Sequence, residues 1–314
     1  MFDPASSPVL IEERLGFFKS YLSGYRLVDW TPERLQDVIA DNPGIRAIVA
    51  AGEKAIPEAV ASLPSLGLVA LMGAGFEGVQ VDRLRERGVE VTHSPGANAP
   101  DVADQAMTLL LAVARGVLEA DRRVRDGLWV DRGTILTQPS IRDLKAGIVG
   151  MGAIGRALAE RLSAFGCEIN WHGPRPKADV TYPFVADLME LARQSDVLLL
   201  CHRADQSNAG MVDARVLEAI GPRGYLVNVS RGSAVDEEAL IRALRDGTLG
   251  GAGLDVFEAE PVAAGRWSDV PRCVLSPHMG GIGSGAWRAN GAKVRENLDC
   301  FFSGRPLVSP VPVA

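Results

Sequence analysis

One short segment constrains the fold more than any other. An apolar run breaks into a G-x-G-x-x-G turn and then into a helix-forming sequence, Gly147-Ile148-Val149-Gly150-Met151-Gly152-Ala153-Ile154-Gly155. Gly150 permits the tight turn, Gly152 lets the backbone approach a pyrophosphate, and Gly155 lets the helix pack close to its strand. Free N–H groups at the start of that helix face the anion. The motif alone is weakly specific, because plain structural turns and methyltransferases contain similar sequences.

The rest of the chain supplies the context that a dinucleotide site requires. After the glycine turn, strands are expected at 147–149, 168–172, 197–201, 225–229, 252–256 and 273–276. Helical patterns lie between them at 154–165, 187–193, 214–220 and 237–245, the last with Asp236 as its N-cap. This alternation predicts β-α-β units and a parallel, doubly wound sheet.

The first hundred residues repeat the alternation on a smaller scale. Strands are expected there at 9–11, 26–29, 47–51, 69–72 and 89–92. One long helix is expected from Pro100 to Asp126, an ordered excursion at 127–140, and a final helix over 287–302 that ends at Ser303-Gly304. We therefore predict an α/β chain of two Rossmann-like domains separated by a cleft, with one domain over 1–99 and 284–314 and the other over 100–283.

Composition excludes several classes of protein. A formal net charge of −6 argues against a general nucleic-acid or anionic-membrane binder. The sequence contains neither an apolar run long enough to cross a bilayer nor a signal-peptide pattern at Met1, so we expect a cytoplasmic protein. Neither the four cysteines nor the four histidines have metal-ligand spacing, so no metal site is expected: Cys167, Cys201, Cys273, Cys300, His93, His172, His202 and His278.

Three segments at predicted strand ends contain candidate catalytic groups. Arg231, in Asn228–Gly232, can direct two N–H groups at one carboxylate, although a surface ion pair is the simpler interpretation. The segment 253–261 brings three acids together and ends at Glu260-Pro261, where helix caps and solvated charges are the alternatives. His278 lies on a glycine-rich loop, which suggests a backbone that a ligand approaches closely.

Taken in order, these segments resemble the D-isomer-specific 2-hydroxyacid dehydrogenase family. The resemblance runs over nearly the whole chain and includes the segments 73–82, 95–104, 150–155, 228–232, 254–261 and 277–281. It implies that Arg231 binds the carboxylate and keto oxygen of a 2-oxo acid. It also implies that His278 is the general acid in reduction and the base in oxidation, with Glu260 hydrogen bonded to it. A carboxylate beside an imidazole favours the protonated ring, and Arg231 adds positive charge where negative charge develops.

The resemblance also implies the binding residues. Backbone N–H groups of Ala74 and Gly75 are expected to bind the substrate carboxylate, and Asp255 to help fix the nicotinamide carboxamide. The domain of 100–283 is then the dinucleotide-binding one and the other binds substrate. The remaining residues expected to line the cofactor are Gly150, Gly152, Ala153, Ile154, Gly155, Gly173, Arg175, Lys177, Cys201 and Val229. A homodimer is the family's habit.

One departure from the family pattern concerns the cofactor. NAD-preferring members place an aspartate at the end of the second strand of this domain, where this chain has Gly173. The sequence continues with Arg175 and Lys177 and has no carboxylate until Asp179. Without that carboxylate a 2′-phosphate is not repelled, and the two basic residues can bind it. This looks like the NADP-preferring glyoxylate and hydroxypyruvate reductases, so we expect NADPH to be preferred and NADH to remain possible.

Several alternatives stay open from sequence alone. Larger 2-oxo acids of the phenylpyruvate type fit the same motifs, and phosphite dehydrogenases share the Arg, Glu and His set. Formate dehydrogenases differ, because they carry glutamine where this chain has Glu260. In a different functional class, dinucleotide-sensing corepressors of the family keep much of the site and act by binding proteins.

Overall fold

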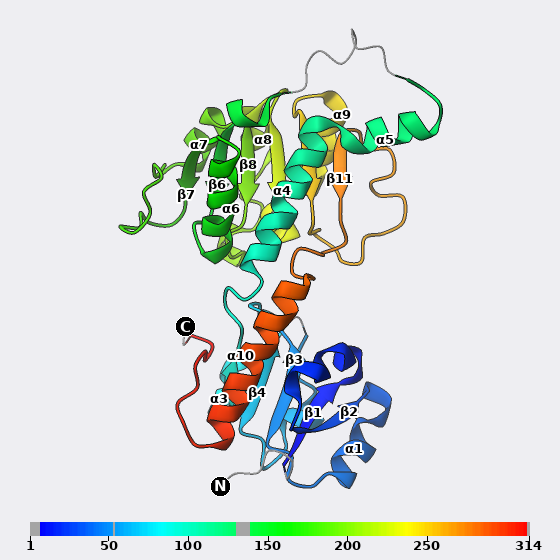
Figure 1. Cartoon of the computed structure of the whole chain (residues 1–314), viewed down its shortest axis with the longest axis vertical. Coiled ribbons are helices and arrows are strands. Elements are labelled where there is room, and N and C mark those ends of the chain that lie inside the picture. The colour runs from blue at the N-terminus through cyan, green and yellow to red at the C-terminus, as the bar shows by residue number, and fades with distance from the viewer. Residues whose placement is uncertain (1–6, 53, 130–138, 313–314) are drawn as a thin grey trace. The chain divides into compact units, whose positions relative to one another are not determined.

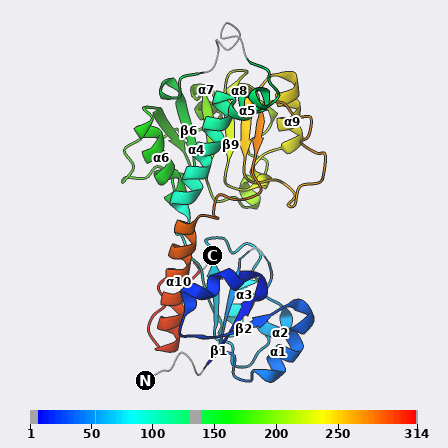
Figure 2. The ribbon, with the colours of Figure 1, turned by 45° about the vertical axis from the view of Figure 1, so that its right-hand side comes forward.

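The computed structural model describes residues 7–52, 54–129 and 139–312 of the 314-residue chain. The chain forms two compact units, one of Met1–Asn98 with Ile282–Ala314 and the other of Ala99–Gly281. Within the described residues, each unit is built around one parallel sheet, with helices on both of its faces (Figures 1 and 2). The prediction of two Rossmann-like α/β domains is confirmed.

The first unit contains a five-stranded sheet in the order β2-β1-β3-β4-β5. Its strands are β1 (Pro8–Glu12), β2 (Arg26–Trp30), β3 (Ala47–Ala51), β4 (Leu68–Met72) and β5 (Glu90–Thr92). One face packs against the 3-10 helix η1 (Glu13–Leu22) and α10 (Ser284–Phe302). The other face packs against α1 (Leu35–Asp41), α2 (Glu58–Ala61) and α3 (Val81–Glu86). Covering both faces explains why β1 and β3 are almost entirely apolar.

The second unit contains a six-stranded parallel sheet in the order β11-β10-β9-β8-β6-β7. The strands are β6 (Lys145–Val149), β7 (Glu168–His172), β8 (Val197–Leu200), β9 (Tyr225–Asn228), β10 (Gly251–Leu254) and β11 (Cys273–Leu275). On one face lie α4 (Ala99–Arg115) and α6 (Ala153–Ala164). On the other lie α7 (Leu188–Gln194), α8 (Ala214–Ile220) and α9 (Glu237–Asp246) (Figure 1).

The strand predictions are confirmed in both units, with small shifts at the ends. The prediction of one long helix from Pro100 to Asp126 is wrong in one respect. It is two helices, because α4 ends at Arg115 and α5 (Val117–Arg125) begins after Gly116. Gly116 has φ of 58°, a left-handed conformation that glycine adopts without strain. Of the predicted excursion, residues 130–138 lie outside the described part of the chain.

The strand order of the second unit creates a site at its carboxyl edge. From the first strand, β6, the chain moves to β7 on one side and then crosses to β8 on the other. Ligands of open α/β sheets bind at such a switch point, outside the carboxyl ends of the strands. The glycine turn follows β6 at this point.

No helix in the described part of the chain is long and apolar enough to cross a membrane.

Candidate active site

The glycine turn after β6 has the geometry of a phosphate cradle. A Cβ on Gly155 would lie 2.1 Å from the carbonyl oxygen of Gly150, so only glycine allows α6 to pack this close. Gly150 has φ of 97°, which also favours glycine. Gly152 is the N-cap of α6, and nothing lies within 4 Å of its Cβ position. The start of α6 therefore opens onto free space at Gly152, and the first N–H groups of a helix have no partner within the helix, so this end can accept an anion.

Cys201, directly after β8, is hydrogen bonded to the backbone of this glycine turn. Its thiol donates to the carbonyl oxygens of Gly150, at 3.2 Å, and Val149, at 3.6 Å. Burial raises the pKa of the thiol to about 12. Cys201 is therefore a neutral packing group at the turn. Val229, which follows β9, is also buried and donates its N–H to the carbonyl of Leu200.

The segment after β7 carries the basic residues expected to select the cofactor. Gly173 and Arg175 lie in a loop in which Arg175 is exposed. Lys177 donates from Nζ to the carbonyl oxygen of Met151 at 2.8 Å, so this lysine is hydrogen bonded to the glycine turn. Asp179 is paired with Arg156 at 2.8 Å, and that guanidinium lowers the pKa of the carboxyl. The first carboxylate that follows Gly173 in the sequence is thus paired with a cation.

Arg231 lies where β9 ends, next to the loop that follows β10. The Asn228 side-chain amide donates to the Arg231 carbonyl at 2.9 Å, and Arg231 Nη1 donates to the Ser230 carbonyl at 2.8 Å. A Cβ on Gly232 would lie 1.8 Å from the carbonyl carbon of Phe257. The two loops are therefore in direct backbone contact, which only a glycine permits.

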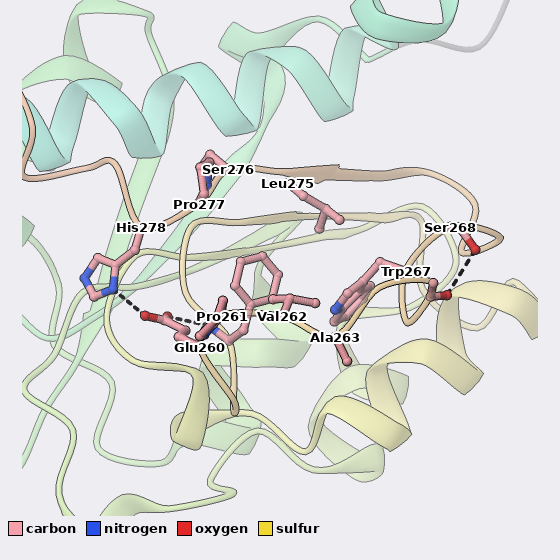
Figure 3. Close-up of a pocket in the computed structure, with 12 residues that line it drawn as sticks. Glu260, Pro261, Val262, Ala263, Trp267, Ser268, Leu275, Ser276, Pro277 and His278 are labelled. Atoms are coloured by element: carbon pink, nitrogen blue, oxygen red, sulfur yellow. Dashed lines mark hydrogen bonds and ion pairs between the residues drawn. The ribbon is translucent and has the colours of Figure 1, made fainter.

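His278 and Glu260 meet across the ends of β10 and β11. His278 Nδ1 lies 2.7 Å from Glu260 Oε2 (Figure 3). Because an ionised carboxylate only accepts, Nδ1 carries the proton and Nε2 is left to face a reactant. Glu260 Oε1 accepts from the N–H of Phe257 at 3.0 Å, which fixes the carboxylate. The side chains of His278 and Glu260 are 40% and 33% exposed, so both are accessible.

Asp255, 2% exposed, fastens the loop that carries His278. Its carboxylate accepts from Ser276 Oγ at 2.5 Å and from the N–H groups of Met279 and Gly280 at 2.9 and 2.8 Å. Its carbonyl accepts from the N–H of His278 at 2.8 Å. These bonds hold His278 at φ of 53°, an uncommon conformation for a residue other than glycine. This role of Asp255 was not predicted from the sequence.

A cavity of about 850 Å³ lies beside Glu260 and His278. Its lining is mostly apolar and includes Val262, Trp267 and Leu275 (Figure 3). The imidazole Nδ1 faces Glu260 at the edge of this cavity, while the other ring nitrogen is directed away from it (Figure 3). Sequence reasoning did not identify Val262 and Trp267 as lining residues, because they lie between β10 and β11 in a segment without a periodic pattern.

In the first unit, Ala74 and Gly75 lie on the loop that follows β4. A Cβ on Gly52 would lie 1.9 Å from the Gly75 carbonyl oxygen, so the loop is packed tightly against the end of β3. The carbonyl of Ala74 contacts His93 Nδ1 at 2.9 Å. Among the described residues, the N–H groups of Ala74 and Gly75 have no acceptor. They are therefore available to an anion.

Comparison with known proteins agrees with this geometry. The family model for the NAD binding domain of D-isomer specific 2-hydroxyacid dehydrogenases matches residues 107–280. Glyoxylate/hydroxypyruvate reductase A of Arabidopsis thaliana is 37% identical over 287 residues, 90% of each chain. Hydroxyphenylpyruvate reductase of Plectranthus scutellarioides is 37% identical over 284 residues, again 90% of each. Among solved structures, the NADPH-dependent glyoxylate/hydroxypyruvate reductase of Sinorhizobium meliloti, in complex with NADP and malonate, is 34% identical with a TM-score of 0.82, covering 97% of this chain and 96% of that one.

Proposed function

The chain belongs to the D-isomer specific 2-hydroxyacid dehydrogenase family, and from that premise we propose that with NADPH it reduces glyoxylate, or hydroxypyruvate, to the 2-hydroxy acid, in the D configuration where the product is chiral. The hydrogen bond between His278 and Glu260 is the observation that carries the proposal. It leaves one imidazole nitrogen directed outward from a fixed carboxylate, as a proton donor requires. The reductase names of the relatives support the substrate class.

A reduced nicotinamide bound at this site would supply the hydride that the keto carbon receives. His278 donates the proton on Nε2 to the keto oxygen as negative charge develops there. Glu260 stabilises the imidazolium before that transfer and fixes the ring through Nδ1. Arg231 binds the substrate carboxylate through its guanidinium and adds positive charge beside the developing alkoxide. In the reverse direction His278 accepts the proton.

Each unit contains its own set of proposed binding residues. We assign the dinucleotide to the unit of Ala99–Gly281, where the start of α6 opens onto free space at Gly152. In the unit of Met1–Asn98 with Ile282–Ala314, the N–H groups of Ala74 and Gly75 are proposed to bind a carboxylate. Asp255 can accept one further hydrogen bond, from the nicotinamide carboxamide, since a carboxylate has about four acceptor sites and three are in use.

NADPH is the proposed cofactor because Gly173 replaces the ribose-binding acid and Arg175 lies exposed two residues further on. Lys177 reaches the glycine turn and adds positive charge to the same region. The binding of NADP by the relative from Sinorhizobium meliloti supports this choice. Arg175→Ala should weaken NADPH binding about tenfold and leave NADH binding unchanged. A wild-type enzyme that prefers NADH would contradict the assignment.

A second substrate class is supported by one observation, which is that a relative 37% identical to this chain is named a hydroxyphenylpyruvate reductase. The test is NADPH oxidation with 2-oxo acids of graded side-chain size, from glyoxylate to phenylpyruvate. Highest kcat/KM for the smallest acids supports the first proposal, and highest kcat/KM for aromatic acids supports the second. In either case His278→Ala should abolish turnover while NADPH still binds, and turnover that persists would refute the mechanism.

We also propose that the protein is a homodimer. Helix α5 exposes Val117, Leu118 and Val124, each more than half accessible, and Trp129 beyond it is 82% exposed. Several large apolar side chains exposed along one short segment are typical of a surface that binds another protein. Light scattering on the purified chain should give twice the monomer mass, and a monomer at micromolar concentration would contradict this proposal.

A further inference from the structure

His202 is a histidine that the proposed mechanism does not use. It lies two residues beyond β8, and its Cα is 2.5 Å from the position of a Cβ on Gly150. The backbone of His202 therefore packs directly on the first glycine of the phosphate cradle. Both of its ring nitrogens are enclosed, and neither has a hydrogen-bond partner. No other imidazole in the described part of the chain has both nitrogens in this state.

His172 provides the contrast. It ends β7 and belongs to the same carboxyl edge, and its carbonyl accepts from the N–H of Gly150 at 2.9 Å. Its ring has a protein partner, because Nδ1 lies 3.0 Å from the carbonyl oxygen of Val185. Two histidines thus flank the glycine turn, one with a protein partner and one without. Buried polar groups in native proteins nearly always have a partner, and the partner is often a ligand or water when the protein supplies none.

The groups around His202 keep its ring neutral. Burial is the largest influence and lowers the pKa of His202, and His172 lowers it further. Asp205, on the loop that follows, acts in the opposite direction. Two cations are also near this edge, since Arg203 is the next residue and Lys177 is bound to the Met151 carbonyl. A neutral ring that lacks a partner beside an anion cradle is poised to gain both a proton and an acceptor.

We propose that His202 is a further cofactor-binding residue, which turns toward the dinucleotide diphosphate at the glycine turn and takes up a proton as it binds. The inference rests on the proposed function, because the glycine turn must hold a dinucleotide. A phosphate oxygen offers the imidazole an acceptor, and its negative charge favours the imidazolium. The proton comes from solvent and stays on the ring, so binding adds one positive charge to the site.

The sign of the pH dependence follows from this uptake. In the free protein the pKa of His202 lies below its ordinary value of 6.5, and in the complex the pKa is expected to be higher. Between these two pKa values the affinity for the dinucleotide falls as pH rises, by at most about tenfold per pH unit for one proton. Outside this range, protonation of His202 does not change the affinity.

The test is calorimetric titration of the full chain with NADP⁺ at pH 6, 7 and 8, in buffers of different ionisation enthalpy. For the wild type we expect a Kd that rises at least threefold from pH 6 to pH 8, with net proton uptake. His202→Gln should bind more weakly at pH 6 and lose both the pH dependence and the uptake. His172→Gln is the matched control and should keep both, because the His172 ring already has a partner.

Wild-type pH dependence and proton uptake in His202→Gln would overturn the inference. If that variant does not fold, the NMR titration of the His202 ring in the wild type replaces it. Its pKa should rise when NADP⁺ is added, and an unchanged value would equally overturn the inference. Failure of the proposed function is distinguishable, because a wild-type chain that binds no dinucleotide at any of the three pH values refutes both, whereas pH-independent binding refutes only the role of His202.

Discussion

The contact between Gly232 and the Phe257–Glu258 backbone allows a sharp test of how the catalytic loops depend on each other. A Cβ at position 232 would lie 1.8 Å from the Phe257 carbonyl carbon and 2.2 Å from the Glu258 nitrogen. Ordinary contacts of a Cβ begin at 3.4 Å, so Gly232→Ala must separate the two loops by about 1.6 Å. Backbone atoms cannot rotate away as a flexible side chain can, so the loops themselves must move.

This movement acts on the catalytic geometry more than on the cofactor cradle. Arg231 precedes the substituted residue, and Glu260 follows the displaced segment by two residues. A misplacement of about 1 Å can reduce the rate about 100-fold, so kcat/KM should fall by at least that factor. A factor of 100 corresponds to about 2.7 kcal/mol of transition-state stabilisation. The glycine turn belongs to β6 and α6, so the Kd for NADPH should stay within about twofold of wild type.

The assay is steady-state reduction of glyoxylate, with NADPH binding measured by fluorescence and unfolding by circular dichroism. Overpacking costs about 1–3 kcal/mol of folding free energy, so activity is measured below the lowered Tm. Gly16→Ala is the matched control, because nothing lies within 4 Å of a Cβ at Gly16, and its kcat/KM should not change. Wild-type kcat/KM in Gly232→Ala would refute the claim that this contact aligns Arg231 with Glu260.

Three further predictions follow from single contacts. Glu260→Gln exchanges a charged acceptor for a neutral one, which is worth about 1 kcal/mol at this partly exposed pair; steady-state kinetics should show reduction slowed about fivefold at pH 7. Asp236→Ala removes the N-cap that accepts from the Ala239 N–H, so thermal unfolding should show a loss of about 1 kcal/mol. Burial raises the pKa of Cys201 and Cys273 to about 12, so mass spectrometry after iodoacetamide treatment at pH 8 should find both unlabelled until the chain unfolds. Unchanged kinetics, an unchanged Tm or rapid labelling would contradict the respective prediction.

The sequence predicted most of the fold because its signals are local. Parallel strands buried on both faces read as continuous apolar runs, and β3 was predicted to the residue. The error at Gly116 has a physical reason. A single glycine inside a helical pattern costs only about 1 kcal/mol, so the periodicity on either side did not require a break. The ten-residue 3-10 segment η1 was also missed, because it has no strong amphipathic pattern.

The candidate site was predicted less completely, because its contacts are not local. Glycine spacing and the order of the motifs placed Arg231, Glu260 and His278 on neighbouring strand ends, and the structure brings His278 and Glu260 into contact. The roles of Asp255 and His202 depend on which atoms are enclosed and which have partners. No spacing rule contains that information, because it arises only when the strands from β6 to β11 are assembled into one sheet.

Asp255 explains how one buried residue can hold two catalytic loops in register. Its N–H donates to the carbonyl of Asn228, at the end of the strand that leads to Arg231. Its carbonyl and carboxylate hold the loop of His278. A Cβ on Gly280 would lie 2.9 Å from the Asp255 carboxylate, so that loop cannot come closer unless position 280 is glycine. An ionised carboxylate is costly to bury unless hydrogen bonds compensate it, and here the compensating donors are the atoms that orient His278. The requirement to satisfy a buried charge and the requirement to aim an imidazole are therefore met by the same bonds.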